Sequence, residues 1–89
     1  KLLLTYFEAK GQAYAFSLIN RFRQAGIKAE VYPDLAKIKK QLEFAAKKEI
    51  PFVGICGDTE ISSGTLSLKN LTTGTQEALS VEAALAFLA

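Results

Sequence analysis

The pattern of apolar and polar positions predicts a strand, a helix and a second strand in the first part of the chain. Residues 2–7 are nearly all apolar, which is typical of a strand buried on both faces of a parallel sheet. Apolar residues then recur at helical spacing over residues 11–25, and Gly26 supplies a natural end for that helix. Residues 27–32 alternate between apolar and polar side chains, and Pro33 after them favours a strand at or near a sheet edge.

The middle of the chain predicts a second helix and a third strand. Asp34 can cap a helix over residues 35–49, in which apolar side chains form an inner stripe and lysines face outward. Pro51 follows this helix, and residues 52–56 make a short apolar strand that ends at Gly57. Strand, helix, strand, helix and strand with short joints imply parallel pairing through right-handed crossovers.

The last part of the chain changes character. Leucines alternate with small polar residues over 65–69, and the turn at Gly74 separates this stretch from a short segment at 76–79. We expect two further strands here, the first antiparallel to its neighbour. Ser80 then caps a final helix. The order β-α-β-α-β-β-β-α predicts one three-layer α/β/α domain over residues 1–89.

Length and composition set limits on the class of protein. With 89 residues, the chain can build one small core. Hydrophobic residues make up 49% and no apolar run approaches the roughly 20 residues that span a bilayer, so we expect a soluble protein without a membrane partner. The chain starts without Met inside an apolar run, which suggests a domain cut from a longer protein.

Charge is distributed unevenly along the chain. The formal net charge of +2 combines ten Lys/Arg and five Asp/Glu in residues 1–49 with one Lys and four Asp/Glu in residues 50–89. This bias is compatible with phosphate contacts at one edge, but it is weaker than the profile of a stand-alone nucleic-acid binder. If RNA binds here, part of the affinity has to come from elsewhere.

The sequence offers no pattern for catalysis or cofactor binding. After the first strand there is one glycine, Gly11, where a dinucleotide fold has Gly-x-Gly-x-x-Gly. Cys56 is the only cysteine and there is no histidine, which excludes an intrachain disulfide and the usual Cys/His zinc sites and weakly favours the cytosol. The scattered carboxylates have no partner for general acid/base work. We therefore assign no catalytic residue, metal ligand or cofactor to this chain.

Two charged residues in the second half are candidates for ligand contacts. Glu60 stands in a predicted loop between Gly57 and Gly64, at the carboxyl end of a strand, where open α/β sheets bind ligands. Its carboxylate can accept hydrogen bonds from a base amino group such as that of guanine, or it can stabilise its own turn. Lys69 is the only basic residue after position 48, and it either contacts a phosphate or base or only adds surface solubility.

Aromatic and charged residues gather where the first two strands end. Tyr6, Phe7 and Tyr32 place three rings near one sheet edge. Unpaired RNA bases stack on such rings, although aromatic residues at strand ends also serve as lids of the core. Three charged residues follow the second strand: Asp34, Lys37 and Lys40. The start of this second helix can present amide donors and lysines to a backbone phosphate, and the alternative for the lysines is a solvated helix face.

Several short motifs occur between positions 40 and 76. They are, in order, Lys40-Gln41-Leu42, Ile50-Pro51-Phe52-Val53, Gly57, Glu60, Gly64, Leu68-Lys69-Asn70-Leu71 and Thr73-Gly74-x-Gln76. Together they resemble the C-terminal anticodon-binding domain of histidyl-tRNA synthetase, in the class IIa aminoacyl-tRNA synthetase group. The Ile-Pro-Phe-Val and Gly-x-x-Glu parts are shared with prolyl, threonyl and glycyl relatives, whereas the leucine-rich and Thr-Gly-x-Gln segment indicates the histidyl branch.

The resemblance implies a five-stranded mixed sheet flanked by helices, in a single domain that binds the anticodon loop of histidine tRNA. It implies that ATP, Mg²⁺ and ligase chemistry belong to a catalytic domain outside these residues, in a cytoplasmic protein that is a homodimer when complete. Glu60 and Lys69 match positions near the anticodon-recognising surface of relatives. The alternative is a synthetase-like domain retained as a regulatory or protein-interaction module, and class II catalytic motifs upstream would distinguish the two.

Overall fold

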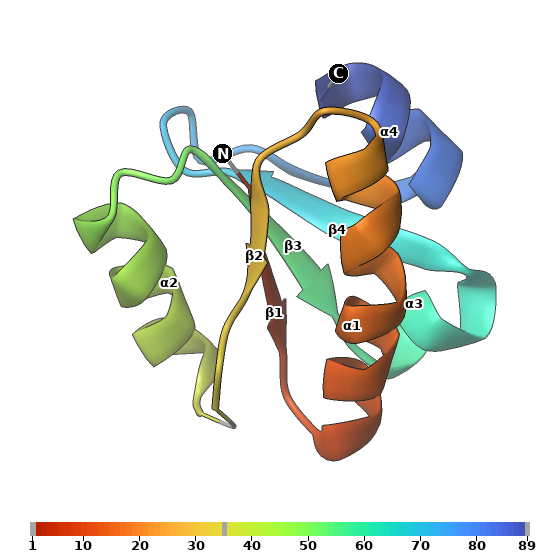
Figure 1. Ribbon diagram of the computed structural model, residues 1–89. Coiled ribbons are helices and arrows are strands. Elements are labelled where there is room, and N and C mark those ends of the chain that lie inside the picture. The colour runs from red at the N-terminus through yellow and green to blue at the C-terminus, as the bar shows by residue number, and fades with distance from the viewer. Residues whose placement is uncertain (1, 35, 89) are drawn as a thin grey trace.

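The computed structural model describes residues 2–34 and 36–88, which form a five-stranded sheet flanked by helices (Figure 1). The elements in chain order are β1 (Leu2–Tyr6), α1 (Ala9–Gln24), β2 (Ala29–Val31), α2 (Ile38–Lys47), β3 (Phe52–Cys56), α3 (Asp58–Ser63), β4 (Thr65–Asn70), β5 (Gln76–Ser80) and α4 (Val81–Leu88). The strand order across the sheet is β2-β1-β3-β4-β5. This architecture confirms the predicted α/β class.

The strands pair as the sequence pattern predicts. β1 runs parallel to both β2 and β3, whereas β4 is antiparallel to β3 and to β5. β2 lies at one edge of the sheet, as the proline after it indicates. Ser80 caps the last helix, since its Oγ accepts a hydrogen bond of 3.1 Å from the backbone N–H of Ala83.

Helices α1 and α4 pack on one face of the sheet and α2 packs on the other, which gives three layers (Figure 1). At Gly11, α1 comes so close to the sheet that an added Cβ would lie 2.6 Å from the Cys56 carbonyl oxygen and 2.9 Å from the Cβ of Tyr6. On the same face, Phe87 of α4 packs edge-on against Phe52 of β3 with ring centroids 5.7 Å apart. All five residues of β1 are buried, so the core lies on both sides of this strand.

The second helix is shorter than predicted. It spans Ile38–Lys47 with Lys37 at its N-cap, so the prediction that Asp34 caps it is wrong. Helical hydrogen bonding starts at Lys37, whose carbonyl accepts from the N–H of Gln41. The predicted start of the helix at residue 35 lies outside the described residues. At the other end the helix stops before its predicted limit, because residue 49 has a left-handed φ of 58°.

A short helix, α3, replaces the loop predicted around Glu60. The Oε1 atom of Glu60 accepts a 2.8 Å hydrogen bond from the backbone N–H of Gly57, which is one half of a capping box. Gly64 follows the helix with a left-handed φ of 66°. None of the six helical residues is buried, so α3 has no apolar periodicity from which a helix could be predicted.

Candidate nucleic-acid interface

The carboxyl ends of three parallel strands meet at one end of the sheet. Because β1, β2 and β3 run in the same direction, the starts of α1, α2 and α3 also lie at this end (Figure 1). Most of the candidate residues are found in the segments that follow these strands: Phe7, Tyr32, Asp34, Lys37, Lys40 and Glu60. The fold therefore brings together side chains that are far apart in the sequence.

A pocket of about 340 Å³ opens between the starts of α1 and α3. Phe7 and Glu60 both line it, and the Phe7 side chain is 52% exposed. Gly57 separates the two: a Cβ at this position would lie 3.3 Å from Cε2 of Phe7 and 2.8 Å from Oε1 of Glu60. The absence of a side chain at Gly57 thus lets an aromatic ring and a carboxylate share one pocket.

Glu60 is half-buried and has a structural contact of its own. Its Oε1 accepts the hydrogen bond from the Gly57 N–H. This contact agrees with the alternative in which Glu60 stabilises its own turn. An ionised carboxylate has about four lone-pair sites on two oxygens, so this bond leaves acceptor capacity on the side chain. The stabilising role and a ligand contact are therefore compatible in one residue.

Tyr6 and Tyr32 lie in the core and do not present stacking surfaces. The Tyr6 hydroxyl donates to the backbone carbonyl of Tyr32 and accepts a 3.0 Å bond from Nε2 of Gln12. Burial raises the pKa of Tyr6 above its usual value. Tyr32 is only 8% exposed and packs edge-on against Phe44 of α2. We correct the predicted stacking role of both residues to that of core lids, because neither ring has a free face.

Gln41 is a residue of this region whose role the sequence did not reveal. It is fully buried, and its side-chain amide accepts from the N–H of Tyr6 at 3.1 Å and donates to the Tyr6 carbonyl at 2.7 Å. The same amide donates to the carbonyl of Ala36 at 2.8 Å. Gln41 thereby joins α2 to the end of β1. A glutamine within an amphipathic helix was the available signal, since a buried amide must find partners.

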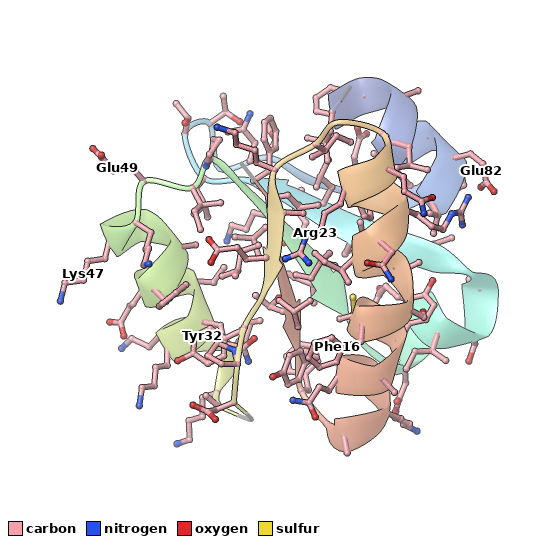
Figure 2. All side chains as sticks on the ribbon, in the orientation of Figure 1. Phe16, Arg23, Tyr32, Lys47, Glu49 and Glu82 are labelled. Carbon is pink, nitrogen blue, oxygen red and sulfur yellow. The ribbon has the colours of Figure 1, made fainter. Side chains whose placement is uncertain are left out.

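The charged residues after β2 are exposed at the start of α2. Asp34 lies in a bend, Lys37 is the N-cap of α2, and Lys40 belongs to its first turn. Lys37 and Lys40 line a shallow, open depression together with Lys39 and Glu43. Lys37 and Lys40 are exposed near the end of the sheet, whereas Lys47 projects outward from the far end of the helix (Figure 2).

Lys69 lies apart from this end of the sheet. It is half-buried on β4, where it pairs across the sheet with Val53 of β3 and with Gln76 of β5. Because β4 is antiparallel to β3, Lys69 is opposite the second residue of β3 and not opposite its carboxyl end. Of the two charged candidates, Glu60 therefore lies at the end of the sheet, whereas Lys69 lies on its face.

Cys56 is a buried thiol at the bottom of the same region. Burial raises the pKa of Cys56 to about 12, and the nearby Glu60 carboxylate adds to this shift. A thiol with this pKa stays protonated and is a poor nucleophile.

Within residues 2–34 and 36–88, no three His, Cys, Asp or Glu side chains are grouped to hold a metal ion. Over the same residues, no helix combines the length and hydrophobicity needed to cross a membrane.

The fold and this end of the sheet define a small α/β nucleic-acid-binding domain. Exposed aromatic rings can stack on unpaired bases, and nearby lysines can contact their phosphates. The chain belongs to the anticodon binding domain family, whose model matches residues 3–89.

Known proteins with similar sequence and structure agree with this assignment. The chain is 44% identical over 86 residues to a histidine–tRNA ligase of Phocaeicola vulgatus, and the match covers 97% of this chain and 19% of that protein. The crystal structure of S. aureus histidyl-tRNA synthetase superposes with a TM-score of 0.88 at 30% identity, covering 99% of this chain and 23% of the other. The RNA binding domain of threonyl-tRNA synthetase from Cryptosporidium parvum has the same fold, with a TM-score of 0.92 at 18% identity over 99% of this chain and 22% of that one. The chain spans about a fifth of the length of the curated relatives it matches.

Proposed function

We propose that this chain binds the anticodon loop of histidine tRNA as the C-terminal domain of a histidine–tRNA ligase. The observation that carries the proposal is the pocket in which the Phe7 ring and the Glu60 carboxylate meet across Gly57. Family membership and the likeness to histidine–tRNA ligases support the choice of tRNA as the ligand. They favour this function over a regulatory or protein-interaction module.

In this proposal, each side chain at the end of the sheet has a defined task. Phe7 stacks on an unpaired base, a contact worth about 1–3 kcal/mol in single-stranded nucleic-acid binding. Glu60 accepts hydrogen bonds from amino or imino groups of that base, which excludes a base that presents acceptors there. Lys37 and Lys40 hold the adjoining phosphates, and Asp34 lies beside them as a weaker candidate for a base contact.

The remainder of the activity belongs to parts of the protein outside this chain. We propose a cytoplasmic parent protein that is a homodimer, with ATP and Mg²⁺ bound in a separate catalytic domain. The single small domain would then contribute recognition of the tRNA and no catalytic residue. Its modest positive charge fits a module that shares the binding of one tRNA with a larger protein.

Titration of labelled anticodon stem-loops at two salt concentrations tests the proposal. We expect the histidine stem-loop to bind more tightly than one with a scrambled loop, with an affinity that falls as salt rises because phosphates are contacted. Equal binding of the two loops would contradict recognition of the anticodon.

The variant Glu60→Gln separates recognition from stability. Glutamine keeps an oxygen for the Gly57 N–H but replaces the second acceptor by a donor, so we expect base preference to fall about tenfold with little change in melting temperature. Glu77→Gln makes the same change on the exposed edge strand β5 and should alter neither property. If Glu60→Gln lost much stability but kept its base preference, the carboxylate would have only a structural role and the recognition role would be refuted.

A further inference from the structure

Strand β2 forms an edge of the sheet, and part of its backbone is used by no other strand of the described chain. Lys28 and Tyr32, on either side of the strand, direct backbone groups toward β1 and are hydrogen-bonded to it. Because these groups alternate in direction along a strand, those of Ala29 and Val31 point away from the sheet. An edge of this kind can pair with a strand of another molecule.

The guanidinium group of Arg23 occupies this edge. Arg23 belongs to the last turn of α1, and its side chain reaches from the helix to β2 (Figure 2). Its Nε and Nη2 atoms donate to the carbonyl oxygen of Ala29 at 3.3 and 3.1 Å. A paired strand would lie about 4.8 Å from β2 and would need the same oxygen as an acceptor. The guanidinium therefore has to leave before a strand can add to this edge.

A second obstacle applies to pairing between two copies of this chain. In an antiparallel arrangement about a two-fold axis, Ala29 of one copy would exchange hydrogen bonds with Val31 of the other. The two Glu30 residues would then lie directly opposite each other as a non-hydrogen-bonded pair, with Cα atoms about 4.5 Å apart. Like charges in directly opposite positions are destabilising, and Glu30 is exposed.

The apolar side chains near this edge favour association. Phe16 precedes Arg23 by seven residues, or two helical turns, so the two side chains lie on the same side of α1. The Phe16 ring is 52% exposed, and Val31 is half-buried. A second copy on the edge of β2 would cover apolar surface here, so charged groups are needed to oppose it.

We propose that Arg23 keeps this domain monomeric by blocking the edge of β2, and that Glu30 reinforces the block by charge repulsion. The partner that is excluded is a second copy of this chain, joined strand to strand. This role is independent of the proposed function, because neither residue lines the pocket between α1 and α3.

A disulfide at position 30 makes pairing at this edge measurable. Glu30→Cys places one thiol from each copy at a separation that suits a disulfide, whereas Cys56 is buried. We expect Arg23→Ala combined with Glu30→Cys to form the disulfide dimer in air about tenfold faster than Glu30→Cys alone, because no guanidinium has to leave the Ala29 carbonyl.

Arg21→Ala combined with Glu30→Cys is the matched control. It removes the same charge from the same helix, but Arg21 contacts Glu82 of α4 and not the edge of β2. Its dimer should form at the rate of Glu30→Cys alone, and circular dichroism checks that each variant is folded. Equal rates in all three proteins would overturn the role of Arg23.

Sedimentation without any added cysteine tests the contribution of Glu30. We expect Arg23→Ala to associate more strongly than wild type, and Arg23→Ala with Glu30→Gln to associate about twofold to fivefold more strongly again, since the facing carboxylates are gone. An association constant unchanged by Glu30→Gln would overturn the role of Glu30. If Arg23→Ala associates but no disulfide forms through position 30, the copies meet at another surface and the proposal fails.

Discussion

Replacement of Gln41 by leucine should destabilise the domain strongly, although leucine is common in helices and similar in size. The side chain of Gln41 is fully buried and makes three hydrogen bonds to backbone groups. Two of these groups belong to Tyr6, at the end of β1, and the third is the carbonyl of Ala36 before α2. Gln41→Leu removes the amide while all three backbone partners remain.

The magnitude follows from the groups left without a partner. Each buried polar group that loses its hydrogen bond costs about 1–3 kcal/mol, which gives about 2–6 kcal/mol for the two bonds to Tyr6. The Ala36 bond is only partly buried, so water can replace the amide there. Leucine recovers about 1–2 kcal/mol through its larger apolar surface. We therefore expect a net loss of about 3 kcal/mol, or roughly 12–24 °C in melting temperature for a domain of this size.

Urea unfolding followed by circular dichroism measures this difference. Gln24→Leu is the matched control, because Gln24 is exposed at the end of α1 and should change stability by less than about 0.5 kcal/mol. A Gln41→Leu protein within about 0.5 kcal/mol of wild type would refute the reasoning. It would show that the Tyr6 backbone groups find other partners at no net cost.

Two further changes test the packing of α1 and the charge at the start of α4. Gly11→Ala should destabilise the domain by about 1–3 kcal/mol, because the added Cβ would lie 2.6 Å from the Cys56 carbonyl oxygen. The loss is measured as a lower melting temperature, and a variant that melts at the same temperature as wild type would contradict this close approach. The pKa of Glu82 is lowered by a hydrogen bond from its own backbone N–H and by Arg21, so its contribution to stability is present above its unfolded pKa and is lost as pH falls through its folded pKa. Glu82→Gln should therefore be less stable than wild type at neutral pH and equally stable in acid, and a constant difference in melting temperature across this range would exclude the effect.

The sheet could be predicted from the sequence because its signals are local and periodic. Leu66 and Leu68 alternate with polar residues, and this alternation alone assigns one face of β4 to the core. The start of α2 could not be predicted in the same way. Asp34 is a good N-cap residue by type, yet the helix begins at Ile38, where the buried Gln41 can reach the end of β1. A contact between residues 35 positions apart leaves no periodic trace in the sequence.

In the candidate site, the sequence could not predict which of two neighbouring side chains is exposed. Tyr6 and Phe7 have the same aromatic character, and both stand at the end of the first strand. Tyr6 is the last residue of β1 and faces the core, where its hydroxyl bonds to Tyr32, whereas Phe7 follows the strand and is exposed. Which of two adjacent rings is available to a ligand depends on the strand boundary and on the helix packed above it. The positions of the aromatic residues in the sequence predict neither the strand boundary nor the packing of this helix.

Gly57 links the local fold to the pocket that we propose for recognition. Its N–H holds one oxygen of Glu60, and its missing side chain leaves room for the Phe7 ring on the same pocket wall. A side chain here would displace either the carboxylate or the ring, while loss of the carboxylate would free an N–H at the start of α3. The spacing of Gly57 and Glu60 therefore sets both the beginning of a helix and the shape of the pocket. Substitution at Gly57 should therefore change both local stability and the proposed base recognition, whereas Glu60→Gln should change the proposed recognition alone.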